Sequence, residues 1–362
     1  MPSPEPLKSG PITLRIVAEA AGVSISTASR ALNGQAREYR ISKATEEAVQ
    51  RVAAELGFQP SQVARSLRLK RSGLVGVIVP DISNPFFSAI AREVSLGVEA
   101  AGYSVLLGDS REETTIEKRL VAQLQARQVE ALLVCPVGLE SQHLVQLDQS
   151  GLPVVVADRV FEDIQLSSVT SDNVAAGRIA TQVLIDHGHR HFGVVSGVRE
   201  SLPTRHRLQG IRQAMLANGL ELDASSIAGD SYTNETGYQS TRELLGRHPE
   251  ITALFAMCAP LAAGVLRALS DLGYAIPMQM SVVSIDDHPF AELMKTPLTA
   301  AAQNIEQLGR VAAEVLLERL KQKRAKDKTL STGPGRGPVC HQVPASLLER
   351  ASVAAPRPTS EF

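Results

Sequence analysis

Apolar residues in the first part of the chain recur at helical spacing. One apolar stripe precedes Gly22 and a second follows Ser24, so that the glycine separates two short amphipathic segments. Ser24 stands where the N-cap of the second segment belongs. The pattern predicts a helix-turn-helix, with a helical hairpin that only packs as the alternative. The stripe residues are Leu14, Val17, Ala18, Ala28 and Leu32.

A third helix is predicted from Ser42 to Gly57. Ser42 is a suitable N-cap, Glu46 and Glu47 are in the favourable first turn, and Gly57 is a common helix terminator. Residues 61–68 then form a segment that is too short to be a stable helix by itself.

From Leu74 onward, apolar runs alternate with amphipathic segments. Continuous β-branched runs separated by helices predict parallel sheets that are covered on both faces. A second set of runs starts near residue 169, so we expect two similar α/β lobes, with chain crossings near residues 165, 297 and 325. The predicted strands are residues 74–79, 103–107, 131–134, 153–156, 192–195, 252–255 and 281–285, and the helices include residues 85–101 and 117–128.

The charge is divided unevenly between the two parts of the chain. Residues 1–72 carry 11 Lys and Arg against 6 Asp and Glu, whereas the remaining residues carry 26 against 32. A basic head on an acidic body fits a protein that contacts phosphate with one end. The 362 residues are enough for two or three domains. We expect a cytoplasmic protein without a membrane partner, because no apolar stretch approaches about 18 residues and no signal peptide is visible.

Few residues suggest catalysis or metal binding. The three cysteines are far apart and odd in number, which argues against a disulfide framework. His187, His189 and His191 alternate in a way that could bring metal ligands together, but the segment also fits a polar turn before the next strand. No GxGxxG follows the first strand, and GxxxxGK[ST] and GxSxG are missing. We therefore expect no catalytic residue, no metal and no cofactor.

Two segments of the head resemble the lactose-repressor (LacI/GalR) family. TLRIVAEAAGVSISTASRALNG is similar to the family's DNA-binding head and PSQVARSL to its hinge helix, while the added REYR at residues 37–40 resembles the fructose-repressor branch. DNVAAGRIATQVLIDHGHRHFGVVSG, RLQGIRQAM, SVVSIDDHPFAELMKTPLT and VPASLLERASVAAP resemble the family's body. The resemblance spans Thr13 to Pro356 and leaves Gln322–Val339 as an ill-matched, disordered insertion.

The resemblance implies an α/β fold class, with an N-terminal helix-turn-helix head and two doubly wound parallel-sheet lobes like a type I periplasmic binding protein. It implies a head at residues 1–59, a hinge helix and linker at 60–72, a two-lobed effector-binding and dimerisation domain at 73–350, and a tail at 351–362. The implied function is a repressor that binds a palindromic double-stranded DNA operator as a homodimer under the control of a small carbohydrate effector. The tail lacks the leucine heptads of a helical tetramerisation segment. A sugar-binding transport protein and a sugar-modifying enzyme are the alternatives.

The predicted DNA contacts come from the second helix and the hinge. Arg30 is suited to a bidentate contact with guanine O6 and N7, and the methyl groups of Ile25 to a thymine methyl. By resemblance, Leu67 is inserted between base steps of the minor groove. The full set is Thr13, Ile25, Ser26, Thr27, Ser29, Arg30, Asn33, Ala64, Leu67 and Arg68.

The predicted effector contacts lie where strands end, which is the usual ligand position in α/β folds. Arg207 and Asp286 are suited to hold hydroxyls or a carboxylate of a sugar-like ligand, although each could instead stabilise its lobe. The family commonly has Asn-Asp where this chain has Cys258-Ala259, which predicts an effector with fewer hydroxyls than a free hexose or one held differently. The resemblance implies the set Phe86, Asp158, Arg207, Tyr232, Cys258, Asp286 and Gln303, with Phe87 beside Phe86.

Overall fold

The structure is a computed structural model that describes residues 12–58, 71–163, 165–329 and 337–356. The chain forms two units, residues 1–72 and residues 73–362. Each unit has its own hydrophobic core. In the described ranges, no helix is long and apolar enough to cross a membrane.

The first unit contains the three predicted helices. Ser24 accepts a hydrogen bond from the backbone N–H of Thr27 (3.1 Å) and Ser42 accepts one from that of Thr45 (3.2 Å), so both are N-caps. Gly22 has a φ of +65°, which makes the turn possible at low cost. The helices are α1 (Leu14–Ala20), α2 (Ile25–Leu32) and α3 (Lys43–Glu55). Their shared core is Val17, Ala18, Ala28, Ala31, Val49 and Ala53.

The first lobe of the second unit is a six-stranded parallel sheet in the order β11-β5-β4-β3-β1-β2. One face packs against α5 and α12 and the other against α6 and α7, as the two separate apolar clusters of this lobe show. The strands are β1 (Leu74–Val79), β2 (Ser104–Asp109), β3 (Ala131–Val134), β4 (Val154–Ala157), β5 (Ser167–Ser171) and β11 (Cys340–Val343). The helices are α5 (Pro85–Ala100), α6 (Thr114–Ala126), α7 (Gln142–Gln149) and α12 (Ile305–Thr329).

The second lobe repeats this plan in a sheet of order β12-β10-β9-β8-β6-β7. The expectation of purely parallel sheets is wrong at one edge, because β12 pairs antiparallel with β10. The strands are β6 (Phe192–Val195), β7 (Ile227–Ala228), β8 (Ala253–Ala256), β9 (Ser281–Ile285), β10 (Thr299–Gln303) and β12 (Ala345–Leu348). The helices are α8 (Asn173–Asp186), α9 (Leu202–Ala217), α10 (Asn234–Arg247) and α11 (Ala259–Asp271), with short 3-10 turns at Ala224–Ser226 and Ala291–Leu293.

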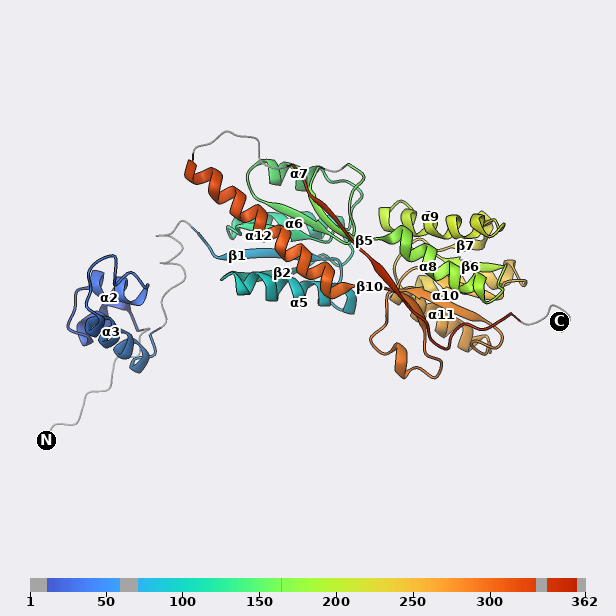
Figure 1. Ribbon diagram of the computed structural model, residues 1–362, viewed down its shortest axis with the longest axis horizontal. Coiled ribbons are helices and arrows are strands. Elements are labelled where there is room, and N and C mark those ends of the chain that lie inside the picture. Colours follow the sequence, from blue (N-terminus) through green and yellow to red (C-terminus); the bar gives the residue numbers. More distant parts are fainter. Residues whose placement is uncertain (1–11, 59–70, 164, 330–336, 357–362) are drawn as a thin grey trace. The chain divides into compact units, whose positions relative to one another are not determined.

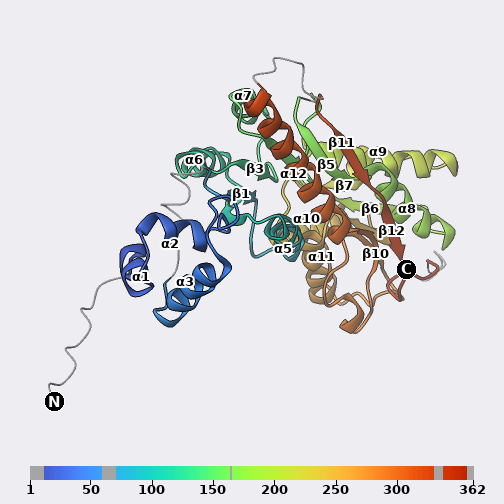
Figure 2. The ribbon, with the colours of Figure 1, turned by 60° about the vertical axis from the view of Figure 1, so that its left-hand side comes forward.

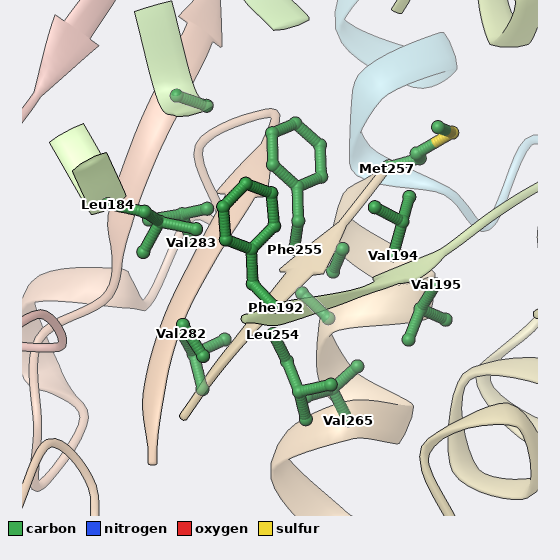
Figure 3. Close-up of a cluster of buried hydrophobic side chains, with 14 of the residues drawn as sticks. Leu184, Phe192, Val194, Val195, Leu254, Phe255, Met257, Val265, Val282 and Val283 are labelled. Carbon is green, nitrogen blue, oxygen red and sulfur yellow. The ribbon is translucent and has the colours of Figure 1, made fainter. Parts of the chain in front are cut away.

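The core of the second lobe is formed by large apolar side chains of its central strands. Phe192 and Phe255 lie side by side between β6, β8 and the neighbouring helices, and Val282 and Val283 of β9 point to opposite sides of the sheet (Figure 3). Two helix pairs, α8 with α9 and α10 with α11, complete this lobe (Figure 1). The buried strands hold the loops at their carboxyl ends in fixed positions.

The chain passes three times between the lobes. It leaves β5 for α8 near residue 172, leaves β10 for α12 near residue 304, and leaves β11 for β12 at Pro344. The predictions near residues 165 and 297 are each seven residues early, and the one near residue 325 is wrong. The third crossing lies later because α12 belongs to the first lobe, where it packs beside α5 (Figures 1 and 2).

The predicted disordered insertion at Gln322–Val339 is partly wrong. Helix α12 continues through Thr329, and Arg324 of that helix donates to Glu130 (2.9 Å) in the first lobe. Lysines and arginines are good helix formers, so a charge-rich segment without internal glycine or proline can extend a packed helix. Residues 330–336 lie outside the described residues.

Helices α8 and α9 approach each other at two glycines. A Cβ on Gly210 would lie 2.0 Å from the carbonyl oxygen of Val174, and one on Gly177 would lie 2.2 Å from that of Arg207. The backbones are thus in direct contact at the point where α9 carries Arg207. This close packing sets where the Arg207 side chain begins.

Candidate functional site

Helix α2 presents polar and small side chains to solvent. Ile25 is 49% exposed even though it is apolar, and Ser26 is also exposed. Thr27, Ser29 and Arg30 are half-buried. An exposed isoleucine on a small helix leaves apolar surface in water.

Thr13 and Asn33 lie at the ends of helices. Thr13 precedes α1 and is exposed, and its side chain makes no capping hydrogen bond. Asn33 ends α2, where its side-chain amide donates to the carbonyl oxygen of Ser29 (2.5 Å). The predicted hinge contacts Ala64, Leu67 and Arg68 lie outside the described residues.

The Arg30 side chain stacks on an aromatic ring. Its Cζ lies 3.8 Å from the centroid of the Tyr39 ring, which belongs to the loop between α2 and α3. Tyr39 is not among the predicted DNA contacts. The single aromatic residue in the added REYR segment was the signal that could have drawn attention to it.

All eight predicted effector residues line one pocket between the two lobes. The cavity has a volume of about 30 Å³, which is room for one or two water molecules. It lies at the carboxyl ends of strands in both sheets, where α/β folds bind ligands. The predicted residues that line it are Phe86, Phe87, Asp158, Arg207, Tyr232, Cys258, Asp286 and Gln303, together with Asn84, Arg159, Pro203 and Pro260.

Asn84, Phe86 and Phe87 form one wall of the pocket at the start of α5. The side chain of Asn84 accepts a hydrogen bond from the backbone N–H of Phe86 (3.0 Å) and so caps the helix. The two phenyl rings contact each other edge to face, with centroids 5.1 Å apart and an angle of 82°. The cap and the ring contact fix both rings against the cavity.

Two buried aspartates occupy equivalent positions in the two lobes. Asp158 follows β4 with a φ of +62°, and Asp286 follows β9 with a φ of +69°. Burial raises the pKa of Asp158 to about 6 even though Arg207 and Arg159 lie near it, and burial also raises the pKa of Asp286. Left-handed backbone at two non-glycine residues is costly and is typical of functional sites.

Arg207 lines the pocket and donates two hydrogen bonds within the protein. Its Nε donates to Asn173 Oδ1 (2.7 Å) and its Nη1 donates to the carbonyl oxygen of Met257 (2.6 Å). It makes no direct ion pair with Asp286, whose carboxylate accepts instead from the side-chain amide of Gln303. Arg207 therefore acts on Asp286 through its charge.

Two acceptor atoms of the pocket are buried without a partner in the described part of the chain. They are Asp158 Oδ1 and Gln303 Oε1. A buried acceptor without a donor costs free energy, on the order of 1–3 kcal/mol. Both acceptors are suited to a ligand that donates hydrogen bonds.

Tyr232 and Cys258 line the pocket from the second lobe. The Tyr232 hydroxyl bonds to Ser201 (2.5 Å) and Thr204 (2.8 Å), and its ring lies on Gly197, where a Cβ would be 2.0 Å from the ring. Burial raises the pKa of Cys258 to about 12, so its sulfur is a neutral thiol. The thiol gives this wall a weakly polar surface.

Arg159 joins the two lobes, although it is not among the predicted effector contacts. It makes two hydrogen bonds to Glu112 (2.6 and 2.7 Å) within the first lobe. Its guanidinium also lies over Phe87 (5.4 Å) and over Tyr232 of the second lobe (4.7 Å). Its place directly after Asp158 was the available signal.

The histidine segment contributes hydrogen bonds within the second lobe. His189 is buried and bonds through its ring to Thr252 (2.7 Å), Ser281 (2.9 Å) and the carbonyl oxygen of Ala354 (2.8 Å). Within the ranges that the structure describes, no group of His, Cys, Asp or Glu is arranged to hold a metal ion.

Both units match known protein families. Residues 13–61 match "Bacterial regulatory proteins, lacI family", and residues 72–337 match "Periplasmic binding proteins and sugar binding domain of LacI family". The transcriptional regulator CelR of Thermobifida fusca is 34% identical over 315 residues, which cover 85% of this chain and 92% of CelR.

Solved structures agree with this match over nearly the whole chain. The lac repressor dimer bound to operator and the anti-inducer ONPF has a TM-score of 0.81 at 26% identity and covers 96% of this chain and 100% of its own. A CelR–cellobiose complex has a TM-score of 0.70 at 31% identity and covers 94% and 99%. The chain therefore belongs to the LacI family of transcriptional regulators, with a helix-turn-helix head and a two-lobed periplasmic-binding-protein-like body.

Proposed function

We propose that the chain is a repressor that binds a palindromic operator as a homodimer and changes its operator affinity when a small carbohydrate binds between the lobes. One observation carries the effector part of this proposal: the seven side chains implied by resemblance, together with Phe87, meet in one pocket. The lac repressor solved as a dimer on operator and CelR solved with cellobiose support the same assignment.

In this proposal, α2 lies in the major groove of each half-site. Ile25 packs on a thymine methyl, Arg30 makes a bidentate contact with guanine, and Ser26, Thr27 and Ser29 bond to base edges or phosphates. Thr13 and Asn33 contact the DNA backbone at the ends of their helices. Ala64, Leu67 and Arg68 act at the operator centre, where Leu67 opens a base step.

The pocket chemistry favours a neutral ligand with several hydroxyl groups. Asp158 Oδ1 and Gln303 Oε1 accept hydrogen bonds from the ligand, which meets their unsatisfied capacity. Phe86 and Tyr232 supply faces for the C–H surface of a sugar ring. The thiol of Cys258 faces a part of the ligand that carries few hydroxyls.

The effector also acts on the contact between the lobes. The cavity has a volume of about 30 Å³, and the stacking of Arg159 on Tyr232 joins the lobes beside it. The effector thus selects a different lobe arrangement, and its differential affinity for the two arrangements sets the change in operator affinity. The protein acts by binding alone, without catalysis or a cofactor.

A thermal-shift screen followed by operator titration tests the proposal. Sugars, sugar acids, sugar phosphates and nucleobases are screened against the full chain, and a ligand at 100 times its Kd stabilises it by about 2.7 kcal/mol. The hit should then change operator affinity in a binding titration, and Arg30→Ala should keep the thermal shift because Arg30 lies in the other unit. A hit that is chemically converted, or one that stabilises the protein without changing operator affinity, would contradict the proposal.

A further inference from the structure

The loop between α2 and α3 is a fixed turn. The backbone N–H of Gln35 donates to the carbonyl oxygen of Arg30 (3.0 Å), and that of Tyr39 donates to the carbonyl oxygen of Gln35 (3.1 Å). The N–H of Ile41 closes the turn onto the carbonyl oxygen of Ala36 (2.8 Å), which is 3% exposed. The loop is therefore anchored to the last turn of α2 and to the core of the head.

This turn places the Tyr39 ring on the Arg30 side chain. The guanidinium carbon lies 3.8 Å from the ring centroid, which is stacking distance, while the ring remains 43% exposed. A tyrosine so exposed contributes little to the core. The ring contacts the guanidinium of Arg30.

Because the Tyr39 ring contacts the face of the Arg30 guanidinium, it does not cover the N–H donors at the edge of that group. The N–H donors of arginine point outward in the plane of the group, whereas an aromatic ring interacts with the face. Recognition of guanine uses two of these in-plane donors. Arg30 can therefore keep its contact with Tyr39 while it meets a base edge.

We propose that Tyr39 is a positioning residue that sets the base specificity of Arg30. The ring restricts the rotation of the long arginine side chain before DNA binds, so less freedom is lost when the contact forms. This inference rests on the proposed reading of DNA by α2. Tyr39 itself touches no base in this assignment.

A double-mutant cycle on the full chain tests the inference. Selection from randomised DNA first gives the operator, and the Arg30→Ala selection shows which base pair loses its preference. Tyr39→Ala should weaken binding to the selected operator by about two- to fivefold per half-site. In the Arg30→Ala background, or on an operator changed at that base pair, the same substitution should have no effect.

Conservative variants separate stacking from packing and from a hydroxyl contact. Tyr39→Phe should keep the preference because the ring is retained, whereas Tyr39→Leu should lose it although an apolar side chain remains. Arg37→Ala, in the same loop, is the matched control and should leave the base preference unchanged. Circular dichroism and thermal melting of each variant report whether the head is folded.

Four results would overturn the inference. A loss that is equally large in the Arg30→Ala background would give Tyr39 a structural role, and a loss on all sequences with a shallower salt dependence would make it a phosphate contact. Unchanged preference in Tyr39→Ala would remove any role. If Arg30→Ala itself keeps the wild-type preference, Tyr39 has no positioning role, although the chain still binds DNA. If the wild-type protein binds no operator, the proposed function itself is refuted.

Discussion

The surface of α2 and the interlobe pocket place polar side chains in opposite environments. On α2, Ala28 and Ala31 pack into a small core, while Ile25 and Ser26 are exposed and Thr27, Ser29 and Arg30 are half-buried. In the pocket, residues from both lobes are buried, and their backbones sit at the ends of strands that are far apart in sequence. The first surface depends on one helix, and the second depends on the packing of an entire unit.

This difference determines what a substitution does. An exposed side chain on α2 can be removed without leaving a buried group unpaired, so only the DNA contact is lost. Removing a side chain from the pocket leaves buried partners without their hydrogen bonds or counter-charge. Large effects should therefore arise in the pocket and smaller ones on α2.

Arg207→Ala should have the largest effect. It removes the donors to Asn173 and Met257 and the positive charge that lowers the pKa of Asp158 and Asp286. Loss of a buried charged partner costs about 3–5 kcal/mol, so the effector response should disappear.

Operator titration with and without effector measures this response, and operator binding itself should persist. Arg212→Ala, an exposed residue on the same helix, is the matched control. A normal effector response in Arg207→Ala would require the pocket assignment to be withdrawn.

Gly210→Ala should be the next most damaging change. The added methyl group would lie 2.0 Å from the carbonyl oxygen of Val174, so α9 must shift away from α8 at a cost of about 1–3 kcal/mol. Effector affinity should fall because α9 carries Arg207. The melting temperature and the effector Kd measure the two effects.

Gly246→Ala is the matched control for this prediction. It lies in α10 and a Cβ there meets nothing within 4 Å, so the same substitution should stabilise the helix by up to about 1 kcal/mol. Equal melting temperatures for the two variants would mean that the α8–α9 contact does not restrict α9.

Arg30→Ala should reduce operator affinity by about 1–3 kcal/mol and relax the preference at one base pair per half-site. Stability should change little because Arg30 is only half-buried. Site selection with both proteins checks the preference, and Arg15→Ala, exposed on α1, serves as a control. A uniform loss on all sequences would instead identify Arg30 as a phosphate contact.

The smallest predicted effect is a pH dependence of effector binding. The carboxylate form of Asp158 accepts hydrogen bonds from the ligand, and its pKa of about 6 means that protonation competes with binding. Affinity should be full above about pH 7 and fall as the pH drops through 6, by at most about 1.4 kcal/mol per pH unit.

Calorimetry between pH 5 and pH 8 measures this dependence, and Asp158→Asn should remove it. Without ligand, the folded protein binds the proton more tightly than the unfolded chain, whose aspartate has a pKa near 3.8. This contribution to stability is present at low pH and is lost as the pH rises from about 4 to about 6. A pH-independent effector Kd would show that Asp158 does not accept from the ligand.

Local features of the fold could be predicted from the sequence. The helix caps at Ser24 and Ser42 and the strands around Val77 and Val283 follow from side-chain chemistry and spacing over a few residues. The crossing at Pro344 and the antiparallel β12 could not be predicted, because they depend on which lobe α12 packs against.

The residues of the pocket also differ in whether the sequence predicts them. Asp158 and Asp286 could be found as polar residues directly after buried strands, and family resemblance supplied Arg207 and Gln303. Arg159 and Tyr39 were not predicted. Arg159 contacts the ring of Tyr232, which is distant in sequence, and Tyr39 contacts Arg30 across a loop. Periodicity and spacing carry no information about such contacts.

The three crossings between the lobes have a consequence for synthesis on the ribosome. The first lobe needs α12 and the edge strand β11, which emerge after nearly all of the second lobe. The head, made first, contains its complete core within residues 12–58. A premature stop codon between residues 72 and 340 should therefore yield a complete head joined to an incomplete first lobe, and this product should not respond to the effector.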